Sequence, residues 1–174
     1  PAVVRRSRSR APRRSGAIAV AVRFISLCLP ALSSLSVPMI LCDLIMAKRG
    51  LILMVGATGA GKSTTMASIV DHRHQNATGH ILTIEDPIEY LHPHMRSTVN
   101  QREIGSDCPN FATALRAALR EAPQVILVGE MRDYETIENA PAAAEAGTRV
   151  CCSLTSRAAS QNSRGNTGLF PRGG

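Results

Sequence analysis

Aromatic residues and an ordered cysteine pattern are the first things this sequence lacks. Only 3% of the 174 residues are aromatic and none is Trp, which argues against the aromatic platforms that stack single-stranded nucleic acid. The five cysteines are odd in number, irregularly spaced and without a CxxC pair. We therefore expect no disulfide framework, and a reduced, cytosolic setting fits this cysteine usage better.

Long uninterrupted hydrophobic runs are also missing. Residues 17–47 are apolar enough to suggest a signal peptide or a membrane span, but they are interrupted by Arg23, Pro30, Pro38 and Asp43. A spanning helix needs about 20 consecutive apolar residues, and no clear small-residue cleavage site follows this stretch. We expect neither a transmembrane segment nor a targeting signal.

The net charge of +7 belongs to the first part of the chain. Residues 1–50 hold nine basic residues and one acid, whereas residues 51–174 hold eleven basic residues and twelve acids. Six arginines fall within residues 1–16. They form either an arm that binds nucleic acid or phosphate, or else a solvated tail or edge strands of a missing domain. Because this arm lacks interleaved aromatics, we favour the second interpretation and expect no nucleic-acid partner.

Apolar runs of strand length alternate with helical patterns from residue 51 onward. The hydrophobic fraction of 44% is enough for a core, and a chain of this size suits one domain or one domain plus part of another. We predict strands at 51–55, 80–84 and 124–128, and helices at 63–71, 110–120 and 134–146. Pro141 is unfavourable inside the last helix. This alternation predicts an α/β fold with a mainly parallel sheet.

The strongest motif is a phosphate-binding loop between the first strand and the first helix. Its sequence GATGAGKS matches G-x-x-x-x-G-K-[ST] in full. We expect Lys62 to reach the β- and γ-phosphates of ATP, and Ser63 to place its hydroxyl on Mg²⁺. The predicted nucleotide-binding residues are Gly56, Ala57, Thr58, Gly59, Ala60, Gly61, Lys62, Ser63 and Thr64.

Acidic residues follow two of the predicted strands. Glu130 ends an apolar strand of Walker B type, although Gly129 stands where the usual pattern has Asp, and we expect Glu130 to polarise the attacking water. Glu85 and Asp86 end the preceding strand, and Pro87 stops its pairing. Because the carboxyl ends of parallel strands line one crevice, these acids are expected to face Lys62.

Two histidine pairs complete the list of candidate sites. His72 with His74 and His92 with His94 have HxH spacing, which is compatible with metal ligation. No cysteine pair or third ligand lies at a suitable spacing. We therefore expect histidines exposed at a helix end and in a loop.

Together these motifs resemble one family, the type IV pilus retraction ATPases of PilT/PilU type within the type II/IV secretion ATPase superfamily. The resemblance is ungapped over residues 40–147 and is carried by the phosphate loop and by residues 48–51, 79–90, 99–105, 114–122 and 125–133. It implies a RecA-like P-loop core in a homohexamer that binds ATP between subunits. It also implies retraction of pili at the cytoplasmic face of the inner membrane, with a pilus platform protein as partner.

The resemblance also assigns roles to individual residues. It implies catalytic roles for Lys62, Glu85 and Glu130, and makes Ser63 and Glu85 candidate Mg²⁺ ligands. Residues 16–25 resemble the end of the PAS-like N-terminal domain of the family. Arginines of that region approach the nucleotide, and the matching positions here are Arg6, Arg8 and Arg23.

The ends of the chain depart from the family pattern. We expect residues 1–35 to be the remnant of the PAS-like domain and its linker, residues 36–155 an incomplete ATPase core, and residues 156–174 a divergent tail. Thr148 and Thr155 replace two family histidines, and threonine cannot offer positive charge to a γ-phosphate. The chain begins at Pro1 and contains a disruptive Pro12, and we expect the C-terminal helical domain of the family to be missing. We interpret it as a partial, error-bearing or decaying copy.

Two alternative functions stay open at this point. One is an assembly or secretion ATPase of the same superfamily. The other is a truncated nucleotide-binding remnant without turnover.

Overall fold

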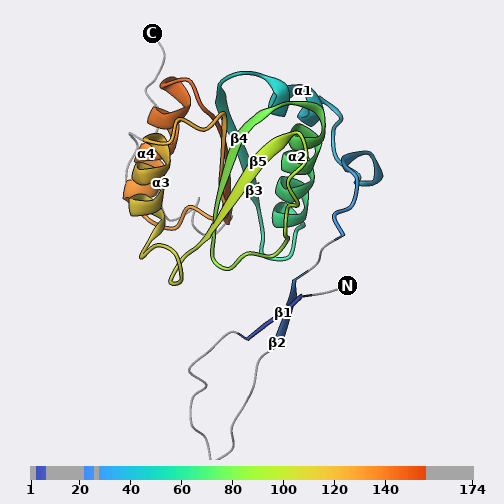
Figure 1. The fold of residues 1–174 in the computed structure, drawn as a ribbon, viewed down its shortest axis with the longest axis horizontal. Coiled ribbons are helices and arrows are strands. Elements are labelled where there is room, and N and C mark those ends of the chain that lie inside the picture. Colours follow the sequence, from blue (N-terminus) through green and yellow to red (C-terminus); the bar gives the residue numbers. More distant parts are fainter. Residues whose placement is uncertain (1–2, 7–21, 26–27, 156–174) are drawn as a thin grey trace, which may run out of the picture.

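A computed structural model describes residues 3–6, 22–25 and 28–155 of the chain (Figure 1). Strands β1 (Val3–Arg6) and β2 (Val22–Ile25) pair antiparallel in a two-stranded sheet. The predicted tail at residues 156–174, together with Arg8 and Pro12, lies outside the described residues.

The main domain is built on a five-stranded parallel sheet. Its order is β3-β7-β6-β4-β5, and every neighbouring pair of strands is parallel. The strands are β3 (Gly50–Gly56), β7 (Arg149–Thr155), β6 (Val125–Val128), β4 (Gly79–Glu85) and β5 (Ser97–Glu103). The predicted α/β fold with a mainly parallel sheet is confirmed.

Helices cover both faces of this sheet (Figure 1). One face carries η1 (Leu32–Ser34), α1 (Ile40–Met46) and α2 (Lys62–Asn76), and the other carries α3 (Phe111–Leu119) and α4 (Tyr134–Glu145). Apolar residues form one buried cluster on each face. All four residues of β6 are buried and contribute alternately to the two clusters, as expected for a central parallel strand.

The helix starts follow from local capping. The Asn110 side chain accepts a hydrogen bond from the Thr113 N–H at 2.8 Å before α3, and Asp133 accepts one from the Thr136 N–H at 2.8 Å before α4. Pro141 was expected to disturb α4, yet the helix is continuous through it. Proline removes one backbone hydrogen bond, and the burial of residues such as Ala140 and Ala143 under the sheet holds the helix in place.

Strand β5 was not predicted from the hydrophobic pattern. It lies at one edge of the sheet, and its sequence STVNQRE alternates buried Ser97 and Val99 with exposed Thr98 and Asn100. An edge strand with one solvated face carries a weak apolar signal. Its register pairs Gln101 with Thr83 of β4, which brings an amide side chain close to the carboxyl edge of the sheet.

Among the residues that the structure describes, no helix is long and apolar enough to cross a membrane.

Candidate functional site

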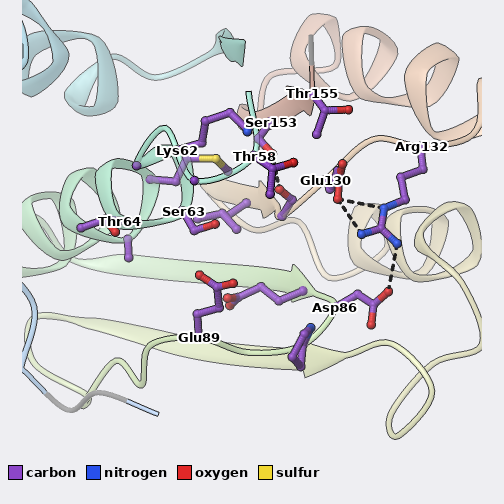
Figure 2. Close-up of a pocket in the computed structure, with 18 of the residues that line it drawn as sticks. Thr58, Lys62, Ser63, Thr64, Asp86, Glu89, Glu130, Arg132, Ser153 and Thr155 are labelled. Carbon is purple, nitrogen blue, oxygen red and sulfur yellow. Dashed lines mark hydrogen bonds and ion pairs between the residues drawn. The ribbon is translucent and has the colours of Figure 1, made fainter. Parts of the chain in front are cut away.

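The candidate site is a pocket at the carboxyl edge of the parallel sheet (Figure 2). It has a volume of about 490 Å³ and is lined by residues from the loop after β3, the start of α2, the ends of β4 and β6 with the segments that follow them, and the end of β7. Parallel strands bring their carboxyl ends to one edge, so loops far apart in the sequence meet there. The lining residues include Lys62, Ser63, Glu85, Glu130 and Thr155.

The phosphate loop connects β3 to the start of α2. Gly59 and Gly61 have φ angles of 80° and 83°, and a Cβ at either position would meet no atom within 4 Å. The left-handed backbone, not a lack of space, therefore calls for glycine there. The helix begins at Lys62, which directs its unpaired backbone N–H groups toward the pocket, the usual arrangement for binding an anion.

Lys62 lies across its own loop. Its Nζ donates to the carbonyl oxygens of Gly56 at 3.0 Å and Ala57 at 2.9 Å. Of the nine predicted nucleotide-binding residues, six line the pocket, namely Thr58, Gly59, Gly61, Lys62, Ser63 and Thr64. Gly56, Ala57 and Ala60 belong to the loop but are not among the lining residues, and the carbonyls of the first two instead hold the lysine.

Glu130 and Glu85 reach the same pocket from neighbouring strands. In the sheet, β7 lies between β3, which leads into the phosphate loop, and β6, which leads into Glu130. The strand inserted between the two motifs brings Ser153 and Thr155 into the pocket lining.

Gly129 packs directly against the end of β4. Its N–H donates to the Ile84 carbonyl oxygen at 2.8 Å. A Cβ at position 129 would stand 3.3 Å from both that oxygen and the Glu85 Cα, and 3.6 Å from the Glu85 Cγ. The side chain of Glu85 thus occupies the space beside the position where the usual Walker B pattern has Asp. Because β4 approaches position 129 so closely, an Asp side chain there would have to displace one of the two strands.

Glu85 is held by hydrogen bonds on one of its oxygens. Its Oε1 accepts from the Thr83 hydroxyl at 2.6 Å and from Gln101 Nε2 at 3.3 Å. Burial raises the pKa of the Glu85 carboxyl above its usual value, while the Thr83 and Gln101 hydrogen bonds oppose the rise and the charge of Glu89 adds to it. The carboxyl group of Glu85 therefore faces the pocket while it is largely shielded from solvent.

Sequence reasoning missed Arg132 as a site residue. Its guanidinium donates to Glu130 Oε2 from Nε at 2.8 Å, its Nη2 lies 2.7 Å from the same oxygen, and its Nη1 lies 3.7 Å from Asp86 Oδ2 (Figure 2). The hydrogen bond with Glu130 raises the pKa of Arg132. Arg132 thus bridges the acids that follow β6 and β4. The sequence signal that could have indicated its role was an arginine two residues after Glu130, the acid that ends the strand.

The two threonines that replace family histidines lie at opposite ends of β7. Thr155 lines the pocket. Thr148 is buried at the other end, where its hydroxyl donates to the Pro123 carbonyl oxygen at 3.3 Å. The expectation that both positions bear on the γ-phosphate is therefore wrong for Thr148, because a residue before a parallel strand lies a full strand length from the carboxyl edge.

The prediction of exposed histidines is wrong for His74 and His92. His74 is fully buried and its Nε2 lies 2.9 Å from Asp71 Oδ1. His92 is buried, lines the pocket and packs edge-on against His74, with ring centroids 6.1 Å apart. Burial, and to a lesser extent His74, lowers the pKa of His92 to about 4, so this ring is neutral at pH 7. His94 is exposed, as expected.

The oxygen-rich lining fits Mg²⁺ better than a transition metal. Within the described residues, no group of three His, Cys, Asp or Glu side chains could hold a metal ion. The pocket instead offers the hydroxyl of Ser63 and the carboxylates of Glu85, Asp86, Glu89 and Glu130. Mg²⁺ takes oxygen ligands and usually combines one or two carboxylates with water and substrate phosphates.

The three candidate arginine contacts stay predictions. The structure describes Arg6 and Arg23 only as backbone positions in β1 and β2, and Arg8 lies outside the described residues.

Comparison with known proteins identifies the relatives of this chain. A family model described as type II/IV secretion system protein matches residues 35–164. Type IV pilus ATPase PilU of Pseudomonas aeruginosa is 46% identical over 144 residues, which are 83% of this chain and 38% of PilU. The type IV pilus retraction ATPase PilT of the same organism is 50% identical over 123 residues, which are 71% of this chain and 36% of PilT.

A solved structure supports the same relationship. The pilus retraction motor PilT with bound ADP superposes with a TM-score of 0.80 at 46% identity, covering 90% of this chain and 47% of that chain. The chain thus spans less than half the length of each of these three proteins. Because the family match covers well over half of the sequence and the fold agrees, the chain belongs to the type II/IV secretion system protein family.

Proposed function

We propose that this chain is the ATP-hydrolysing core of a type IV pilus retraction motor. One observation carries the proposal: a single pocket brings Lys62 and Ser63 of the phosphate loop together with Glu85 and Glu130 from two other strands. A cation, a hydroxyl and two carboxylates around one anion-binding loop are the groups that phosphoryl transfer to water requires. The similarity to a PilT structure with bound ADP supports the same conclusion.

The proposed reaction is in-line attack of water on the γ-phosphate of ATP. Backbone N–H groups of the loop and helix α2 cradle the phosphates. Lys62 leaves its loop carbonyls to neutralise negative charge on the β- and γ-phosphates, and Glu130 orients and polarises the water. Ser63 and Glu85 would hold Mg²⁺, which when bound neutralises further charge on the phosphate oxygens.

The contact with Arg132 is part of this mechanism. Glu130 shares one carboxylate oxygen with the guanidinium, so its orientation is set before water binds. Preorganised groups of this kind lower the barrier because they need not reorganise during the reaction.

The wider assembly is proposed from the family resemblance. We propose a homohexamer at the cytoplasmic face of the inner membrane that acts on an inner-membrane pilus platform protein. The identities of 46% and 50% to PilU and PilT support pilus retraction over assembly or secretion. Thr155 in the pocket, at a family histidine position, favours the alternative of a nucleotide-binding remnant without turnover.

Substitution of Lys62 tests the site directly. We expect Lys62→Ala to abolish ADP release by the purified chain without unfolding it, because the only side-chain cation of the loop is removed. Lys48→Ala is the matched control, since Lys48 is exposed and does not line the pocket. Unchanged turnover in Lys62→Ala would refute the site assignment. A wild-type chain that binds nucleotide but releases no ADP would favour the remnant.

A further inference from the structure

Gln101 lies at the centre of a hydrogen-bond network that joins β5 to the candidate site. Its Nε2 donates to the Tyr90 carbonyl oxygen at 2.8 Å and to Glu85 Oε1 at 3.3 Å. Its Oε1 accepts from the His92 N–H at 3.0 Å. One half-buried amide therefore contacts both the strand-end carboxylate and the segment that follows it in the chain.

The orientation of this amide follows from its partners. A backbone N–H can only donate, so the amide oxygen faces His92. A carbonyl and a carboxylate can only accept, so the amide nitrogen faces Tyr90 and Glu85. If the amide were reversed, its NH₂ group would face the His92 N–H, and its oxygen would face the Tyr90 carbonyl oxygen and the Glu85 carboxylate. The network thus has a single consistent arrangement.

The same network reaches the phosphate-loop helix. The Tyr90 hydroxyl lies 3.0 Å from the Thr64 hydroxyl, and Thr64 lines the pocket. Gln101 fixes the backbone on either side of Leu91, so it sets the position from which Tyr90 reaches α2. At the other end of the network, Thr83 of β4 is paired in register with Gln101 of β5, and both side chains donate to Oε1 of Glu85.

We propose that Gln101 is a positioning residue for Glu85, orienting its carboxylate in the pocket while tying it to the segment that carries Tyr90 and His92. The proposal rests on the proposed function, because it assigns Glu85 a part in ATP hydrolysis. Gln101 itself does not line the pocket, so it acts through Glu85 and not on the nucleotide.

Two substitutions separate the contacts of Gln101. Gln101→Leu removes every hydrogen bond of the side chain. Gln101→Glu keeps an oxygen for the His92 N–H but offers no donor to Glu85 or to the Tyr90 carbonyl. We expect both variants to lower kcat about tenfold to a hundredfold, because small displacements of catalytic groups have effects of this size. The KM for ATP is expected to change less than about twofold, since the hydrogen bonds of the Gln101 side chain go to Glu85, Tyr90 and His92 and not to the phosphate loop itself.

Asn100→Leu is the matched control for these variants. Asn100 precedes Gln101 on the same strand, is exposed and does not line the pocket, so its kcat is expected to stay at the wild-type value. Because Gln101→Glu offers Glu85 no donor, the proposal excludes turnover of ATP at the wild-type rate in this variant. That result would overturn the proposal.

A spectroscopic readout tests the contact independently of turnover. In the full chain labelled with ¹⁵N, the side-chain NH₂ signals of Gln101 should move in Glu85→Ala and stay in place in Glu89→Ala, because Glu89 lines the pocket without a side-chain bond to Gln101. Gln101 signals unchanged by Glu85→Ala would overturn the proposal even in an active enzyme. The wild-type chain could also show no turnover although the Gln101 signals move in Glu85→Ala. That result would refute the proposed hydrolysis but would support the contact between Gln101 and Glu85.

Discussion

Placing a side chain at Gly129 should separate β6 from β4 at the candidate site. A Cβ there would stand 3.3 Å from the Ile84 carbonyl oxygen and from the Glu85 Cα. Both atoms belong to backbone that cannot rotate away, so one strand must move by a few tenths of an ångström. The same movement strains the Gly129 N–H bond to Ile84, which is 2.8 Å long. Overpacking of this kind costs about 1–3 kcal/mol.

We therefore expect Gly129→Ala to lower the free energy of unfolding by about 1–3 kcal/mol, measured by urea denaturation with an unchanged m-value. Gly129→Asp, which restores the usual Walker B acid, should cost more, because it adds a third carboxylate beside Glu85 and Glu130. Gly56→Ala is the control, since the nearest atom to its Cβ would be the Ala60 Cβ, at the ordinary contact distance of 3.4 Å. A Gly129→Ala chain as stable as wild type, or a Gly129→Asp chain with higher turnover, would refute this reasoning.

Two further predictions concern the side chains that sequence reasoning misjudged. Because the pKa of His92 is lowered to about 4 in the folded chain and is about 6.5 when unfolded, its contribution to stability is fully present above pH 6.5 and is lost as pH falls toward 4. Urea unfolding between pH 7 and pH 5 should show that the free energy of unfolding changes with pH less steeply in His92→Phe than in wild type, by up to about 1.4 kcal/mol per pH unit; equal slopes in the two proteins would contradict the burial argument. Arg132→Ala should change the free energy of unfolding by less than about 1 kcal/mol, because the guanidinium pairs with Glu130 and Asp86 at the surface. The same substitution should lower ATP turnover, because it releases the carboxylate of Glu130. A variant as active as wild type would remove Arg132 from the mechanism.

The strongly patterned parts of the chain were predictable because local physics suffices there. Strands β3, β4 and β6 are short apolar runs, and each was located within one residue at either end. The phosphate loop was found because its glycines and its Lys-Ser pair lie next to one another in sequence. Even the meeting of Glu85 with Lys62 was predictable, since parallel strands share a carboxyl edge.

The misjudged parts depend on contacts between distant segments. Strand β5 carries a weak apolar signal because it is an edge strand, and its partner β4 determines which residues face inward. His74 and His92 are 18 positions apart, and their burial follows from the packing of α2 against the segment before β5. No local pattern distinguishes such a pair from exposed histidines.

The covalent order of residues was enough to establish the α/β class, the phosphate loop and the acids that end two strands, because each depends on neighbours in the chain. The order of the strands was not readable in the same way: β7, late in the sequence, inserts between β3 and β6. That insertion brings Thr155 into the pocket and leaves Thr148 at the far end of β7. Arg132 reaches Asp86, and Gln101 reaches Glu85, only when the strands pair, because the side chains of each pair come from segments that are distant in the sequence.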